Sequence, residues 1–256
     1  MEFKAAYHTD VGIRKSTNQD SVAIRIIDTP KGKVAFSIVC DGMGGLAKGE
    51  LASKEVILAF CDWFDNRFTD EILDGSFSGN LLHKEWGEII QVQNQKLGAF
   101  GTENHFMLGT TISVLLMFEE EFYIVHVGDS RIYEVTDQCK MLTKDQTFVA
   151  REVEMGRMTP EQAEVDPRRS VLLQCVGASE VVTPDFMKGK TKKNATYLLC
   201  SDGFRHKISD EEVIEKLGPE QCQDEDQLRY GCFYLTELVK NRRETDNISV
   251  ITIRTM

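Results

Sequence analysis

The chain has no excess of basic residues and no long apolar run, and each absence excludes a class of protein. Its net charge is −11, whereas a nucleic-acid-binding surface needs clustered lysine and arginine. The apolar stretch ISVLLMF is about the longest, far below the ~18 residues of a membrane span. The opening segment MEFKAAYHTD has no basic region followed by an apolar one, so it does not predict a signal peptide. We therefore expect a cytoplasmic protein that binds neither nucleic acid nor membranes.

Paired cysteines are also lacking. The seven cysteines are odd in number, scattered along the chain and never spaced as CxxC. This spacing argues against a zinc site and against a disulfide framework. The cysteines are therefore predicted to be reduced thiols, mostly packed as small apolar groups.

Strand-like and helix-like segments are mixed along the chain. Apolar patterning predicts strands at 4–8, 21–28, 33–40, 111–118, 122–127, 131–135, 196–200 and 248–254, and helices at 49–68, 80–100 and 227–240. This order favours an α+β fold over strict βαβ alternation. Residues 146–170 are rich in charge and broken by Gly and Pro, which predicts a surface flap. With no Ser/Gly-rich linker, we expect a single domain, 1–256, with a flap at about 146–170.

Five aspartates lie where predicted strands begin or end: Asp20, Asp41, Asp129, Asp202 and Asp246. Each alone has an ordinary explanation, because Asp-Gly pairs form turns and Asp caps helices. Together they are less ordinary, since strand ends of one sheet system tend to lie near one another. Carboxylates that converge cannot all stay ionised unless a cation lies among them.

The surroundings of these aspartates favour a hard cation. No histidine or cysteine accompanies them at ligand spacing, and all-oxygen ligands suit Mg²⁺ or Mn²⁺ rather than zinc. In the segment VCDGMGG, Asp41 ends an apolar run and is followed by Gly42, Gly44 and Gly45. Small residues let backbone carbonyls and water approach an ion closely. We therefore expect Asp41 to be a metal ligand held by a rigid strand.

Six motifs follow one another in a recognisable order. They are RKSTNQD, DGMGGLAKGELAS, GTT at 109–111, GDSR at 128–131, SDG at 201–203 and DN at 246–247. Together they resemble the metal-dependent Ser/Thr protein phosphatases of type 2C, the PPM family, over nearly the whole chain. The compact chain, the Met in DGMGG and the NQD form are similar to bacterial members. The resemblance implies a four-layer α-β-β-α sandwich, with two packed antiparallel sheets flanked by helices and a flap insertion.

The resemblance also implies a ligand set for two core ions, Mn²⁺ or Mg²⁺. Asp41 would bridge both ions, Asp202 and Asp246 would hold the first, and the Gly42 carbonyl would hold the second. A third, weaker ion would use Asp129 and Asp202.

The implied reaction is the hydrolysis of phosphoserine and phosphothreonine in proteins by a metal-activated water. Asp20 would join Asp41, Asp202 and Asp246 as a catalytic residue, acting through bound water in the outer shell. No phosphoenzyme is needed, so no nucleophilic cysteine or serine is required.

Three positions depart from the family pattern. Lys15 stands where members usually have the arginine that binds the substrate phosphate, and Arg14 precedes it, so either side chain is a candidate. Gln19 replaces a Glu found in many members. Met43 replaces the His that eukaryotic members carry as a proposed general acid, and the proton donor stays open. His126 is expected to be a packed or surface residue. His206 lies nearer the expected site but is also expected to have no catalytic role.

Two alternatives remain. The chain could be a pseudophosphatase that binds phosphoproteins without turnover, although the presence of Asp41, Asp202 and Asp246 favours an enzyme. It could also be a narrower phosphatase for phosphoserine on anti-sigma antagonist proteins. The resemblance further implies phosphoprotein partners, an opposing Ser/Thr kinase and a monomeric chain.

Overall fold

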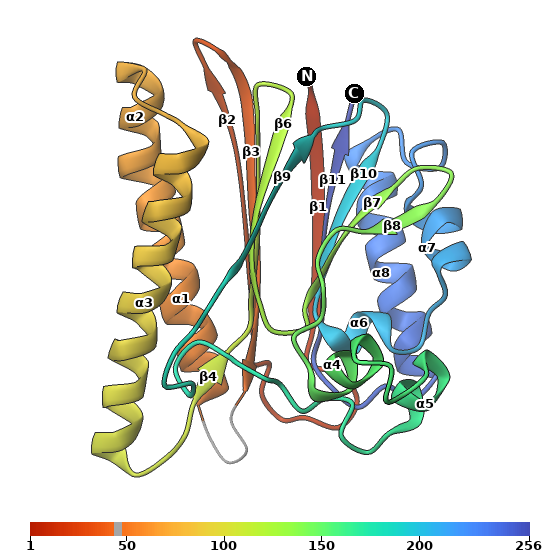
Figure 1. Ribbon diagram of the computed structural model, residues 1–256. Helices are drawn as coiled ribbons and strands as arrows, with labels where there is room; N and C mark the ends of the chain where they lie inside the picture. Colours follow the sequence, from red (N-terminus) through yellow and green to blue (C-terminus); the bar gives the residue numbers. More distant parts are fainter. Residues whose placement is uncertain (44–47) are drawn as a thin grey trace.

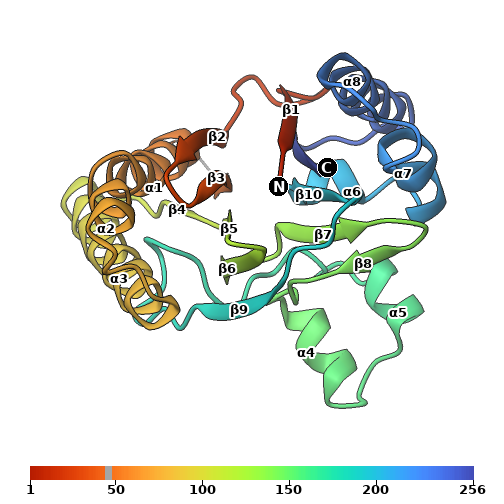
Figure 2. The same ribbon diagram turned by 90° about the horizontal axis from the view of Figure 1, so that it is seen from above.

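Two antiparallel sheets stack face to face, and helices cover the outer face of each sheet (Figures 1 and 2). The computed structural model describes residues 1–43 and 48–256, so Gly44 and Gly45, expected to leave Asp41 uncrowded, lie outside it. The arrangement confirms the expected α+β sandwich of four layers. None of the described helices is long and apolar enough to cross a membrane.

Each sheet has a simple strand order. The first sheet runs β1 (Phe3–Asp10), β11 (Ile248–Thr255), β10 (Thr196–Cys200), β7 (Arg131–Val135) and β8 (Cys139–Met141). The second runs β2 (Asp20–Thr29), β3 (Gly32–Met43), β5 (Ile112–Phe118), β6 (Glu121–Val127) and β9 (Asp185–Lys190), with β4 (Gly109–Thr110) paired to β3.

The helices divide between the two outer faces. The second sheet is covered by α1 (Gly49–Asp62), the π-helix η1 (Trp63–Phe68), α2 (Thr69–Asp74) and α3 (Gly79–Asn104). The first sheet is covered by α6 (Asp202–Arg205), α7 (Asp210–Leu217) and α8 (Glu225–Asn241). The flap contains α4 (Phe148–Glu154) and α5 (Pro160–Val165). The predicted helices are confirmed within a few residues at most ends, whereas α2, α6, α7, β4, β8 and β9 were not predicted.

Three apolar layers hold these elements together. The helices α1 and α3 pack on the second sheet, α7 and α8 pack on the first, and a central layer lies between the sheets. Burying this much apolar surface is the dominant stabilising term in such a domain. The seven cysteines form no disulfide, and six of them are buried, which agrees with their predicted role as packed thiols.

Two buried glutamates, Glu71 and Glu85, lie in the helices that cover the second sheet. Trp63 donates from Nε1 to Glu85 Oε2 at 2.7 Å. Glu71 is buried beside Glu85, and Arg67 forms ion pairs with both. Burial, and then the neighbouring Glu85, raises the pKa of Glu71 to about 7.

Candidate functional site

Side-chain alternation along the strands directs two aspartates into the space between the sheets. On β3, Ala35 and Val39 face the central layer, so Asp41, on the same side of the strand, faces it too. On β2, Val22 contacts the same layer, and Asp20 continues its face. Asp20 and Asp41 are direct partners in the β2–β3 ladder. Asp41 therefore lies within β3, and the expectation that the strand ends before it was wrong.

The other sheet brings two more aspartates to this end of the sandwich, which is opposite the chain termini in Figure 1. Asp202 follows β10 and begins α6, whereas Asp246 lies just before β11. Gly203 makes their approach possible, because a Cβ there would lie 2.2 Å from the Asn247 carbonyl oxygen and 3.4 Å from Asp246 Cβ. A larger residue at position 203 would force the two aspartates apart.

Asp129 lies in the connection between β6 and β7 and is only 4% exposed. Gly128 turns the chain there with φ of 107°, and Thr111 fills the space beside it. Thr111 Oγ1 also accepts a hydrogen bond from the Asp41 backbone N–H at 3.0 Å. Thr110 Oγ1 donates to the Asp41 carbonyl oxygen at 2.9 Å. Both threonines of the GTT motif therefore support the backbone of Asp41.

The five aspartates influence one another electrostatically. Burial raises the pKa of Asp20 to about 7, although hydrogen bonds with two serines oppose this rise. Burial raises the pKa of Asp129 to about 8, and the charge of Asp202 adds to the shift. The pKa of Asp41 rises well above its ordinary value, first through burial and then through the charges of the other four aspartates. The cluster thus resists full ionisation unless a cation joins it.

The residues present fit hard divalent cations. Asp20 Oδ1 and Asp202 Oδ1 are buried and have no hydrogen-bond partner within the described part of the chain. Such orphaned carboxylate oxygens are costly without a ligand. Lys15 Nζ already lies 3.0 Å from Asp246 Oδ1, which shows that this carboxylate attracts positive charge. All these donors are oxygens, as Mg²⁺ and Mn²⁺ prefer.

The cluster is not a finished chelate. Among residues 1–43 and 48–256, no three Asp, Glu, His or Cys side chains form a group ready to hold a metal ion. Binding of an ion would therefore require the carboxylates to move closer together. Gly42 packs closely against the neighbouring backbone. A Cβ at this position would lie 2.2 Å from the Gly49 carbonyl oxygen and 2.4 Å from the Gln19 carbonyl oxygen.

Several supporting residues were missed by sequence reasoning. Ser201 Oγ donates to Asp20 Oδ2 at 2.8 Å and thereby links the two sheets. Asn247 Oδ1 accepts from the Gln19 backbone N–H at 3.0 Å, which ties the loop before β2 to the start of β11. Glu244 Oε1 accepts from the Asp246 backbone N–H at 3.1 Å. Ser201 and Asn247 belong to the SDG and DN motifs, so these motifs were the sequence signal that could have identified them.

The two candidate phosphate-binding side chains and the two histidines differ in their position relative to the aspartate cluster. Arg14 and Lys15 are both exposed, and only Lys15 contacts an aspartate of the cluster. His126 is buried and hydrogen-bonded to Ser113, so its predicted packing role is present. His206 Nε2 lies 3.7 Å from Asp202 Oδ2, nearer to the cluster than its expected bystander role suggested.

Comparisons with known proteins agree with this geometry. Residues 11–233 match the family model described as protein phosphatase 2C. The chain is 31% identical over 257 residues to the serine/threonine protein phosphatase PstP of Mycobacterium tuberculosis, covering 98% of this chain but only 45% of that protein. It is 29% identical to the protein phosphatase PhpP of Streptococcus pneumoniae, covering 80% of each.

A solved structure shows the same similarity. The catalytic domain of PstP in complex with two manganese ions superposes with a TM-score of 0.78 at 29% identity, covering 98% of this chain and 97% of that one.

Proposed function

Since this chain belongs to the protein phosphatase 2C family, as its bacterial relatives do, we propose that it hydrolyses phosphoserine and phosphothreonine in proteins with divalent cations as cofactors. The observation that supports this most is the convergence of Asp20, Asp41, Asp129, Asp202 and Asp246 at one end of the sandwich. The raised pKa values of Asp20, Asp41 and Asp129 call for positive charge that the protein supplies only in part. So do the orphaned oxygens of Asp20 and Asp202.

The proposed roles of the residues follow from the family resemblance of their motifs. Asp41 would bridge two Mn²⁺ or Mg²⁺ ions, with Asp202 and Asp246 completing one site and the Gly42 carbonyl the other. When bound, such ions neutralise phosphoryl charge and lower the pKa of a water for in-line attack. Asp20, held by Ser201, would orient water in the outer shell.

The direct test is hydrolysis of p-nitrophenyl phosphate and of a phosphothreonine peptide, with Mn²⁺ and then with EDTA. We expect turnover with Mn²⁺ that EDTA abolishes and fresh Mn²⁺ restores. Binding of the peptide without turnover at any Mn²⁺ or Mg²⁺ concentration would instead establish the pseudophosphatase alternative. Turnover that persists in EDTA would contradict the metal-dependent mechanism.

Lys15 and Arg14 are proposed to bind the substrate phosphate. Lys15 pairs with Asp246, and ions bound there would release its ammonium group toward the substrate. Loss of a charged hydrogen bond to phosphate should raise KM by roughly tenfold with a smaller change in kcat. We therefore expect Lys15→Ala or Arg14→Ala to weaken phosphopeptide binding in steady-state kinetics. The matched control is Lys31→Ala, an exposed lysine in the β2–β3 turn. Unchanged KM in both variants would refute the assignment.

The flap is proposed to select among phosphoproteins. Its two ends are joined, because the Phe148 backbone N–H donates to the Val171 carbonyl at 2.8 Å and Thr147 forms a β-bridge with Leu172. A two-residue Asn-Gly turn can therefore replace residues 149–170 without opening the base. This deletion should change kcat/KM for phosphoproteins by roughly tenfold or more and for p-nitrophenyl phosphate much less. Equal effects on both substrates would show that the flap has no selective role.

We propose that the enzyme acts as a cytoplasmic monomer and opposes a Ser/Thr kinase, as the family resemblance implies. A narrower preference for phosphoserine on anti-sigma antagonist proteins is distinguished by comparing phosphoserine and phosphothreonine peptides of one sequence.

A further inference from the structure

A guanidinium group occupies the side of the aspartate cluster where a third cation would bind. Arg205, the last residue of α6, places Nη2 3.6 Å from Asp129 Oδ2 and 3.4 Å from the Asp129 carbonyl oxygen. Both side chains are largely buried, at 16% and 6% exposure for Arg205 and Asp129. At this depth water screens the attraction only weakly. Arg205 therefore already supplies positive charge to Asp129.

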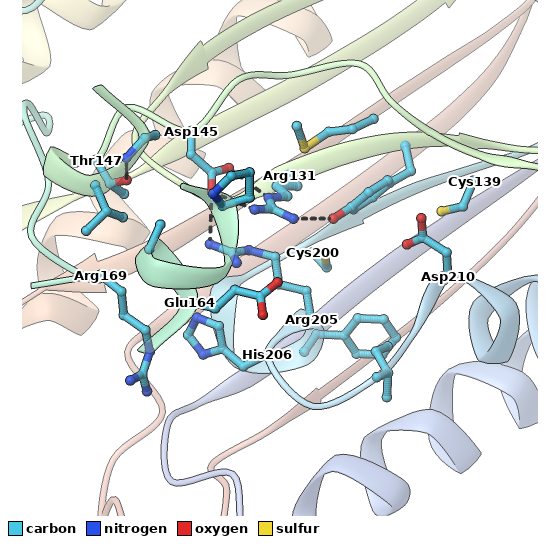
Figure 3. Close-up of a pocket in the computed structure, with 18 of the residues that line it drawn as sticks. Arg131, Cys139, Asp145, Thr147, Glu164, Arg169, Cys200, Arg205, His206 and Asp210 are labelled. Atoms are coloured by element: carbon cyan, nitrogen blue, oxygen red, sulfur yellow. Dashed lines mark hydrogen bonds and ion pairs between the residues drawn. The ribbon is translucent and has the colours of Figure 1, made fainter. Parts of the chain in front are cut away.

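A second ion pair holds Arg205 in this position. Its Nη2 also donates to Asp145 Oδ2 at 3.3 Å. Arg131 also binds Asp145. The Nε and Nη2 atoms of Arg131 donate to the two carboxylate oxygens of Asp145 at 2.8 Å each. Figure 3 shows Arg131, Asp145 and Arg205 side by side against the flap. The two arginines thus supply positive charge to both Asp129 and Asp145.

The guanidinium of Arg205 is only partly hydrogen-bonded. Its Nε is buried and has no hydrogen-bond partner in the described residues, so the side chain is held through Nη2 alone. Next to it, between the flap and β7, β8, α6 and α7, lies a cavity of about 1090 Å³. Arg205 and Arg169 both line this cavity (Figure 3). This cavity is the space that the guanidinium would enter on leaving Asp129.

We propose that the guanidinium of Arg205 is a built-in substitute for the third metal ion, so that this chain binds two divalent ions tightly and a third only by displacing Arg205. The inference depends on the proposed metal-dependent function. Asp129 cannot pair with Arg205 and bind a divalent ion in the same place, because two adjacent cations repel each other. Asp202 Oδ1, buried and without a partner in the described chain, is the other oxygen available to a third ion.

The test is Mn²⁺ binding to the full chain, measured by isothermal titration calorimetry and by electron paramagnetic resonance of free Mn²⁺. We expect the wild type to bind two ions tightly. Arg205→Gln should add a third site, or tighten a weak third site by about tenfold or more, because the competing charge is gone. The double variant Asp129→Asn/Arg205→Gln should lose that site. Arg205→Met is a second variant, since its apolar side chain of similar length fits the cavity wall.

The matched control is Arg169→Gln, which removes an arginine from the same cavity but not from Asp129. It should leave Mn²⁺ binding as in the wild type. Arg205→Gln and Arg205→Met variants that fold normally by circular dichroism yet bind Mn²⁺ as the wild type does would overturn the inference, as would an equal gain in Arg169→Gln. In that outcome two bound ions would still support the proposed function. Absence of Mn²⁺ binding in every chain, including the wild type, would instead refute the proposed function and the inference with it.

Discussion

Asp41→Asn is expected to abolish phosphatase activity and yet to make the metal-free protein more stable. Asp41 is the carboxylate proposed to bridge the ions, so its loss should lower kcat/KM by about 10³-fold or more. In EDTA the same carboxylate is surrounded by like charges that raise its pKa, so ionising it opposes folding. The neutral amide should therefore increase the free energy of unfolding at pH 8 by about 1–3 kcal/mol. Steady-state kinetics with Mn²⁺ and thermal melting in EDTA measure the two effects.

Asp28→Asn is the matched control for this variant. Asp28 lies near the other end of β2, and its side chain is 82% exposed. Its replacement should leave kcat/KM and the melting temperature close to those of the wild type. If Asp41→Asn retained substantial Mn²⁺-dependent turnover, Asp41 would not be the bridging ligand. If it melted below the wild type in EDTA, the proposed electrostatic strain would be absent.

In EDTA, the wild type is expected to lose stability as the pH rises from 5 to 7. The carboxyl groups of Asp20 and Asp129 have pKa values of about 7 and about 8 in the folded state, against the ordinary value of 3.8. In this window the folded state holds protons that the unfolded state has released. Stability therefore falls with rising pH, by up to about 1.4 kcal/mol per pH unit for each such group. Chemical denaturation at several pH values measures the slope.

Mn²⁺ should reverse this trend, because it binds ionised carboxylates and replaces the protons. At 100 times the dissociation constant, an ion that binds only the folded state adds about 2.7 kcal/mol. Asp129→Asn should flatten the slope in EDTA. Glu71→Gln, which removes the other carboxyl group with a pKa of about 7, should reduce the slope but leave the Mn²⁺ response unchanged. A wild type whose stability in EDTA does not fall over this range would contradict the raised pKa values.

The strands and the aspartate cluster were predictable because their signals are local. Each strand of the core carries an alternating or continuous apolar run, and polar residues that continue the inward face at its end must meet those of neighbouring strands. The elements that were missed lack such runs. The edge strand β9 is only partly buried, and α7 buries little more than Val213 and Leu217, so neither shows a clear apolar period. Their formation depends on tertiary pairing and on the Ser209 capping box.

The network around Arg205 could not be predicted for a different reason. Arg205 meets Asp129 across 76 positions of sequence, and Asp145 across 60. No local pattern indicates which buried carboxylate a given arginine will reach. The same holds for Ser201, whose contact with Asp20 crosses from one sheet to the other. The motifs identified the aspartates, but only the fold shows which positive charges already lie among them.

The central claim is that aspartates from both sheets share bound divalent ions. The most direct measurement is an anomalous difference map, collected at the manganese absorption edge, from crystals grown with Mn²⁺. We predict two strong peaks with the Asp41 carboxylate between them, one of the two also bound by Asp202 and Asp246. Peaks located elsewhere, or no peak near Asp41 at saturating Mn²⁺, would contradict the account.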